Sequence, residues 1–128
     1  MSNASLWIRA RNRSWRTSAS LFSRRLLRLT RQEPIISFTF DDFPRSALYD
    51  GGEILKAHRC AGTYYASAGI MGSEQPTGEM FTAEDLSTLL KQGHELGCHT
   101  FGHDDARDTR ADVFEASIVK NQEALKAL

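Results

Sequence analysis

Three short apolar runs, each followed by a segment whose apolar residues recur every three or four positions, most strongly constrain how this chain of 128 residues can fold. The β-branched and aromatic runs predict strands, and the three-to-four spacing predicts amphipathic helices. Strands that alternate with helices form parallel βα units, because a parallel pair needs a long crossover connection. The predicted elements are a buried strand over residues 35–40, a helix over 46–58, a strand over 62–67, a helix over 82–92, a strand over 95–98 and a helix from 109 onward.

Capping sequences mark the starts of the last two predicted helices. Thr82 with Asp85 three positions later resembles a capping box, and Gly93 is a typical helix stop. Residues 109–112 form a second predicted cap, which opens a helix with Phe114, Ile118, Leu125 and Leu128 on one side. The segment 69–80 is rich in glycine, serine and proline and is predicted to be a loop.

The charges are divided unevenly along the chain, although the formal net charge is zero. Residues 1–31 hold eight arginines and no acid, which leaves 8 basic and 16 acidic side chains, a balance of −8, on the rest. We expect residues 1–33 to form a basic arm, with three interpretations open: a solvated extension, an anchor on an anionic membrane surface, or a nucleic-acid contact supported by charge alone. No specific nucleic-acid partner is predicted.

The apolar runs are too short for a membrane span, which needs about 20 residues. Arg24 and Arg25 interrupt the one apolar stretch that resembles a secretion signal, so we expect no cleavable signal. A cytoplasmic or peripheral-membrane location is the corresponding expectation.

Acidic and histidine side chains follow two of the predicted strands. Asp41 and Asp42 come directly after the first strand, and His99 and His103 follow the third. Taken singly, the aspartates are also typical of a turn or helix cap, and two histidines four apart are also common without a ligand. Because the carboxyl ends of parallel strands can share a cleft, we expect Asp42, His99 and His103 to lie within reach of one metal ion.

Two motifs in this order resemble the polysaccharide deacetylase family, also described as the nodulation-protein-B homology domain of carbohydrate esterase family 4. Thr39-Phe40-Asp41-Asp42 is similar to the first family motif, and His99-Thr100-Phe101-Gly102-His103 is similar to the second. The resemblance extends over residues 34–128. It implies an α/β fold: the N-terminal portion, about three βα units, of a distorted (β/α) barrel, here preceded by the basic arm.

The resemblance also implies a role for each matched residue. Asp41 would be the general base that activates water, and Asp42, His99 and His103 would hold a divalent ion, most often zinc, with cobalt or nickel as alternatives. The reaction would be metal-dependent removal of N-acetyl groups from an N-acetylated polysaccharide or oligosaccharide, of the chitin oligosaccharide or peptidoglycan type.

The later motifs of the family are missing from residues 104–128, which contain no proline, tyrosine, tryptophan or histidine. The histidine that would protonate the leaving amine is among them. A truncated, non-catalytic metal- or carbohydrate-binding remnant is therefore the alternative function. Because three βα units cannot close a barrel, we also expect an oligomer or a partner chain.

Overall fold

The computed structural model describes residues 18, 21, 30 and 33–128. The chain divides into two compact units, Met1–Ile35 and Ile36–Leu128, and the sheet with its connecting helices belongs to the second. The predicted basic arm, and with it the predicted membrane contact, lies almost entirely outside the described residues. Among the helices that the structure describes, none combines the length and the apolar content that crossing a bilayer requires.

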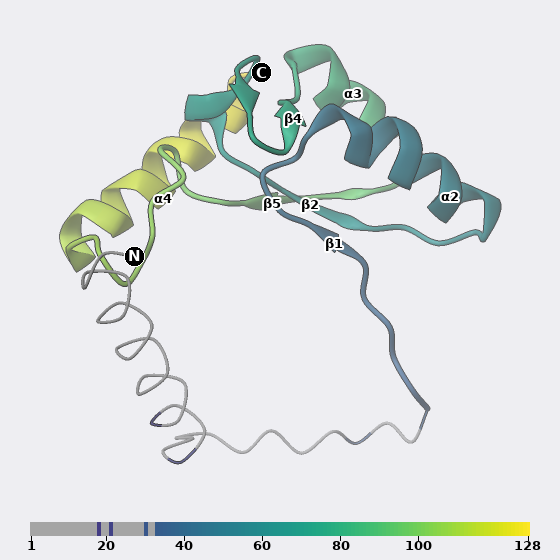
Figure 1. Ribbon diagram of the computed structural model, residues 1–128, viewed down its shortest axis with the longest axis horizontal. Coiled ribbons are helices and arrows are strands. Elements are labelled where there is room, and N and C mark those ends of the chain that lie inside the picture. Colours follow the sequence, from purple (N-terminus) through teal and green to yellow (C-terminus); the bar gives the residue numbers. More distant parts are fainter. Residues whose placement is uncertain (1–17, 19–20, 22–29, 31–32) are drawn as a thin grey trace, which may run out of the picture. The chain divides into compact units, whose positions relative to one another are not determined.

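A three-stranded parallel sheet is the centre of the described unit (Figure 1). Its order is β1 (Thr39–Phe40), β2 (Thr63–Ala66) and β5 (Glu95–Cys98), with β2 in the middle. Phe40 pairs with Tyr64, and Ala66 pairs with Cys98. All three strands therefore end at the same edge of the sheet, the edge where parallel folds place their chemistry.

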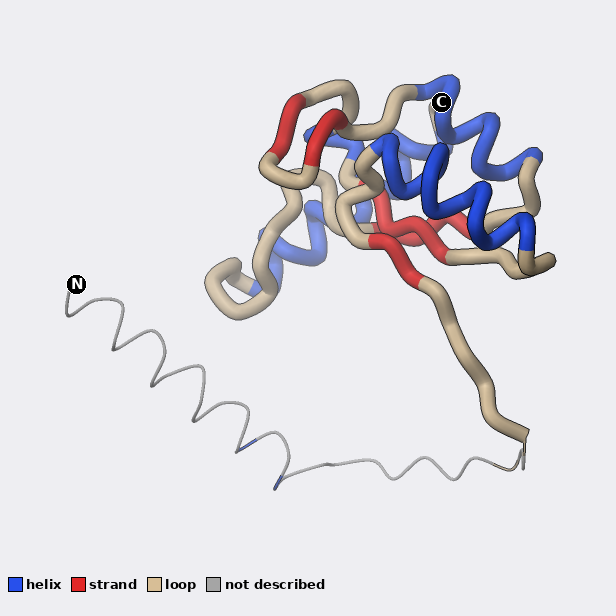
Figure 2. Tube along the Cα trace, turned by 45° about the vertical axis from the view of Figure 1, so that its right-hand side comes forward, coloured by secondary structure: helices blue, strands red, loops and turns tan. Residues whose placement is uncertain are grey.

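Helices connect the strands as the sequence pattern predicts, and Figures 1 and 2 show α2 and α3 on the same side of the sheet. The predicted loop over residues 69–80 is more ordered than expected, because it contains a 3₁₀ turn and a small antiparallel hairpin. The remaining elements are a π-helical turn η1 (Ala47–Gly51), α2 (Gly52–Ala57), the 3₁₀ turn η2 (Ala68–Ile70), the hairpin strands β3 (Glu74–Gln75) and β4 (Gly78–Glu79), α3 (Ala83–Lys91) and α4 (Ala111–Lys126).

One predicted helix cap is confirmed and the other is wrong. At α3, the Thr82 side chain accepts a hydrogen bond from the Asp85 backbone N–H, and the Asp85 carboxylate accepts one from the Thr82 N–H at 2.9 Å. At α4 the cap residue is Arg110, which makes no side-chain capping bond. A charged pair, Arg110 with Asp112, occupies that end of the helix instead.

Asp85 is also the buried end of a small polar network. Its carboxylate accepts a hydrogen bond from the Tyr49 hydroxyl at 2.5 Å and lies 3.0 Å from Nε of Arg45. Burial favours the neutral acid, but the hydrogen bonds from Tyr49 and Thr82 and the charge of Arg45 outweigh it, so the pKa of Asp85 lies below its ordinary value. The network ties η1 to the start of α3.

The core lies between the helices and one face of the sheet. Tyr64 and Ala66 of β2 are fully buried, whereas the alternating Thr63 and Tyr65 are partly exposed. Leu48 of η1 and Leu86 and Leu89 of α3 pack against the buried side. Parallel sheets are usually covered on both faces, so the partial exposure of Thr63 and Tyr65 on the other face is the unusual feature of the described unit.

The prediction of a buried strand over residues 35–40 is wrong in part. Only Thr39–Phe40 pairs as a strand, and the side chains of Ile35 and Ile36 are 68% and 78% exposed. The apolar composition of the run is typical of a buried strand. However, β1 is an edge strand, and in the part of the chain that the structure describes no element covers the residues before Thr39.

Candidate metal centre

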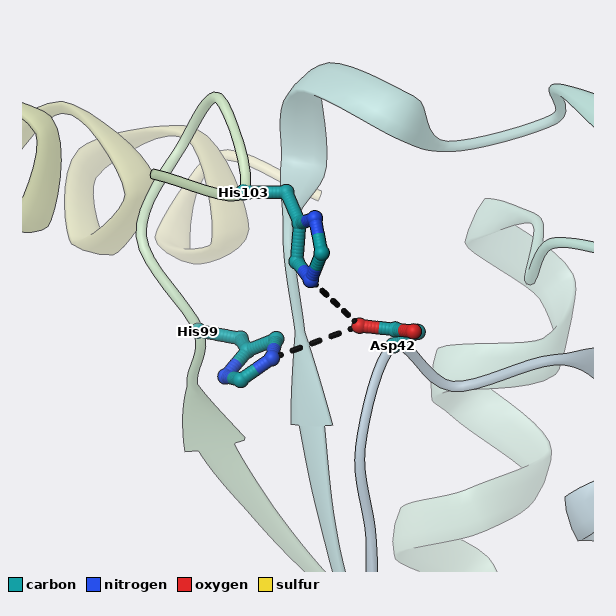
Figure 3. A group of neighbouring side chains, drawn as sticks. All are labelled: Asp42, His99 and His103. Atoms are coloured by element: carbon teal, nitrogen blue, oxygen red, sulfur yellow. Dashed lines mark ion pairs between the residues drawn. The ribbon is translucent and has the colours of Figure 1, made fainter. Parts of the chain in front are cut away.

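Asp42 and His99 lie at the carboxyl ends of the two outer strands of the sheet. Asp42 follows β1 by two residues, His99 follows β5 directly, and His103 comes four residues later. The middle strand β2 separates β1 from β5, so the two chain segments start about 10 Å apart. The side chains meet because both segments turn inward after the strands end (Figure 3).

Left-handed backbone conformations make those inward turns. Asp42 and Phe43 have φ angles of 65° and 54°, and Thr100 and His103 have φ angles of 61° and 57°. Non-glycine residues adopt this region rarely, at a cost of about 1–3 kcal/mol for each strained residue. Strained backbone of this kind persists only where the surrounding structure holds it in place, and it is most common at functional sites.

Burial of Phe43 holds the first of these turns. Its side chain is fully buried, with its ring stacked on Phe81 at a centroid distance of 5.0 Å and tilted against Tyr64 at 5.0 Å. The Phe43 carbonyl also accepts a hydrogen bond from the Phe81 N–H at 3.1 Å. Core packing therefore compensates for the unfavourable backbone and leaves the Asp42 carboxylate at the strand end.

Strand alternation positions His99. Because Tyr65 pairs with Gly97, His99 lies on the same face of the sheet as these two residues, and its ring centroid is 6.3 Å from that of Tyr65. A Cβ atom at Gly97 would lie 2.4 Å from Cδ1 of Tyr65, so only glycine allows the Tyr65 ring to lie there. The Ser67 hydroxyl donates a hydrogen bond of 2.8 Å to the His99 carbonyl and fixes its backbone.

Both imidazoles point at the same carboxylate oxygen (Figure 3). Oδ1 of Asp42 lies 3.3 Å from Nε2 of His99 and 2.9 Å from Nε2 of His103. The three ligand-type atoms all lie within 4.8 Å of one another. Two donors that share one ion at about 2.0 Å in tetrahedral geometry are about 3.3 Å apart, so the three residues fit a single cation.

The surroundings of Oδ1 of Asp42 favour a bound cation. Oδ1 is buried and, among the residues that the structure describes, receives no hydrogen bond of normal donor geometry. A buried acceptor without a partner is costly, and two imidazole lone pairs directed at a carboxylate would repel it. A divalent cation between the three atoms satisfies all of them, so this donor set fits a metal.

The sequence matches the profile of the polysaccharide deacetylases over residues 28–128. The chain belongs to the polysaccharide deacetylase family. The resemblance predicted from the two motifs is thereby confirmed.

The fold of this deacetylase-family chain is similar to a solved structure, that of IcaB from Ammonifex degensii, with a TM-score of 0.67 and 19% sequence identity. The similarity covers 77% of this chain and 47% of the IcaB chain, so the chain spans about half the length of that structure. The predicted fold class, a mixed α/β portion of a (β/α) barrel, is confirmed by this similarity. No curated protein sequence matches the chain.

Asp41, the predicted general base of the deacetylase-family chain, is exposed at the end of β1 next to Asp42. It is not a member of the three-residue cluster. Its role stays a prediction that follows from the first family motif.

The two other histidines lie away from the cluster. His94 is buried, and its Nδ1 accepts a hydrogen bond of 3.1 Å from the Gly62 N–H; burial lowers the pKa of His94. His58 is exposed at the end of α2. Asp104, which directly follows the histidine motif, accepts a hydrogen bond from the Ser117 hydroxyl of α4.

A pocket of about 530 Å³ adjoins the cluster, with His99 and His103 among its lining residues. Phe114 and Ile118, one turn apart on α4, supply its apolar side. The sequence placed both residues on the apolar side of a helix but did not indicate that this side borders the site. In the sequence, the one indication of this was their spacing from the histidine motif. The packing of α4 against β5 is what brings them to the pocket.

Proposed function

We propose that Asp42, His99 and His103 bind one divalent cation and that the protein hydrolyses N-acetyl groups of an N-acetylated polysaccharide or oligosaccharide. The observation that carries the proposal is the convergence of two imidazole nitrogens on one buried carboxylate oxygen, in a chain of the polysaccharide deacetylase family. Two nitrogens and one carboxylate oxygen suit zinc best, and cobalt and nickel accept the same ligands.

In this proposal, different residues bind the cation, accept the proton and contact the substrate. Asp42 and the two histidines would hold the cation. When bound, a divalent cation polarises an amide carbonyl and lowers the pKa of water. Asp41, exposed beside the cluster, takes the proton from the attacking water as general base. The apolar side of the pocket, formed by Phe114 and Ile118, suits the acetyl methyl group or the face of a sugar ring.

A second candidate function is binding of a metal or carbohydrate without turnover. The observation in its favour is that His94 and His58 lie outside the cluster, so within the described residues no further histidine is placed to protonate a leaving amine. Hydrolysis and binding differ in product release, which separates the two candidates.

Cation binding is tested by isothermal titration of the metal-free chain with Zn²⁺ and Co²⁺. We expect one ion per chain, and a loss of affinity of at least about 100-fold in His103→Gln, because removing a ligand costs no less than removing a residue that supports one. His58→Gln is the matched control, since His58 is exposed and outside the cluster. Equal affinities in the two variants would refute the assigned ligands.

Turnover is tested by measuring acetate released from N-acetylglucosamine oligomers in the presence of Zn²⁺ or Co²⁺. Wild-type protein should release acetate, and Asp41→Asn should bind the cation with unchanged affinity but release none. A wild-type chain that binds the cation and releases no acetate would establish the second candidate instead.

A further inference from the structure

We propose that Ser117 of α4 is a positioning residue for the two imidazoles, because its hydroxyl fixes the backbone that joins His99 to His103. The proposal rests on the proposed metal site and adds to it a residue outside both family motifs. Ser117 touches neither imidazole among the contacts of the described residues, so any effect it has on the site passes through the loop.

One hydroxyl group contacts the loop at three places. The backbone N–H groups of Phe101 and Gly102 donate to Oγ of Ser117 at 2.9 and 3.4 Å. The same hydroxyl donates its proton to the carboxylate of Asp104. Ser117 is therefore bonded to residues on both sides of His103, and also to the stretch that follows His99.

The first half of the loop has other support, because Ala66 and Ser67 bond the His99 backbone, and Gly69 and the Ser117 carbonyl bond the Phe101 backbone. The Ser117 hydroxyl adds the contacts to Gly102 and Asp104, the residues on either side of His103. Thr100 and His103 both have positive φ angles. Thr100 is buried, but Gly102 and the His103 side chain are exposed, so burial does not fix the conformation of His103. A second bond within the loop, from the Asp104 N–H to Oγ1 of Thr100 at 2.7 Å, closes the turn. Without the Ser117 bonds, His103 can relax to a commoner backbone conformation, and its imidazole would move from Asp42.

The helix that carries Ser117 is itself fixed against the strand ends. Asn121, one turn further along α4, is fully buried and accepts a hydrogen bond from the Ala68 N–H at 2.8 Å. Its amide group also donates to the Ala66 carbonyl at 2.8 Å and to the Cys98 sulfur at 3.2 Å. Ser117 and Asn121 share one face of α4, so the loop is held from a rigid element.

A serine in the middle of α4 also has no local advantage. Serine forms helix less readily than alanine, since its hydroxyl competes for backbone hydrogen bonds. At position 117 the hydroxyl instead bonds to a different segment. A matched serine exists in α3, where Ser87 is exposed in the interior of the helix.

The test compares Ser117→Ala with Ser87→Ala in the full chain. In metal-free protein, amide hydrogen exchange of residues 101–104 should be faster in Ser117→Ala, and the side-chain NMR resonances of His99 and His103 should shift. Titration with Zn²⁺ should show an affinity about 10- to 100-fold lower, the range seen when residues that support metal ligands are removed. The visible absorption of bound Co²⁺ should change as well. Ser87→Ala should match wild type in all four measurements, and Ser117→Thr, which keeps the hydroxyl, should recover most of the affinity.

Each outcome decides between the proposals. Unchanged exchange and unchanged histidine resonances in Ser117→Ala would overturn the positioning role. So would faster exchange combined with wild-type cation affinity. If wild-type protein binds no divalent cation, the proposed function fails; the positioning role is then decided by the histidine resonances of the metal-free protein alone.

Discussion

Gly69 is the position where one added methyl group should both destabilise the fold and disturb the histidine loop. A Cβ atom at Gly69 would lie 2.3 Å from the Phe101 carbonyl oxygen, whereas ordinary contact begins at 3.4 Å. The two segments must therefore separate by about 1 Å. This also breaks the hydrogen bond of 2.9 Å from the Gly69 N–H to the same oxygen.

The expected loss in the free energy of unfolding follows from these two contacts. Overpacking against backbone costs about 1–3 kcal/mol, and losing one backbone hydrogen bond costs about 0.5–1.5 kcal/mol. Gly69→Ala should therefore lower stability by about 2–4 kcal/mol. Because Phe101 lies between His99 and His103, the affinity for Zn²⁺ should fall as well.

Urea unfolding followed by circular dichroism measures the change, with Gly52→Ala as the control. A Cβ atom at Gly52 would meet no atom closer than 3.4 Å, and the residue has helical φ and ψ angles. Alanine favours helix over glycine by about 0.5–1 kcal/mol, so this control should be neutral or more stable. A Gly69→Ala variant as stable as wild type would refute the reasoning from this close approach.

Two further predictions concern pH and association. The pKa of Asp85 is lower in the folded chain than in the unfolded one, so its contribution to stability is present above about pH 4 and is lost as the pH falls through the folded value. Tyr49→Phe should make stability less dependent on pH, as measured by urea unfolding between about pH 2 and pH 6. The chain should self-associate, since within the described residues β1 and β5 each pair on one side only and Ile36 and Val113 are 78% and 52% exposed. Light scattering should then give a mass above 14.4 kDa that Ile36→Lys lowers, and a monomer with a single cooperative unfolding transition would contradict this.

The sequence predicted well those features that depend on neighbouring residues. The order of strands and helices follows from the spacing of apolar residues, and β5 spans the residues expected for it. The capping box at Thr82 is a contact between residues three apart, which the chain makes as soon as the helix forms. Family membership likewise follows from two short motifs that can be recognised without coordinates.

The burial of residues 35–38 could not be predicted in this way. Apolar composition indicates that a strand is suited to burial, but not whether another element covers it. The structure leaves Ile35 and Ile36 exposed because β1 lies at the edge of the sheet. The hairpin within residues 69–80 was missed because each strand has only two residues, too few to show a periodic pattern.

The sequence by itself determined which residues are available to form a site: one aspartate pair after the first strand and two histidines after the third. Only the tertiary structure decided that Asp42, His99 and His103 meet. Strict alternation from Phe40 would direct the Asp42 side chain to the helix-covered face, and the left-handed turn at Asp42 and Phe43 redirects it. That turn exists because Phe43 is buried against Phe81 and Tyr64, which lie far away in the sequence. Since this distant packing offsets the cost of the strained backbone, no local sequence pattern predicts the turn.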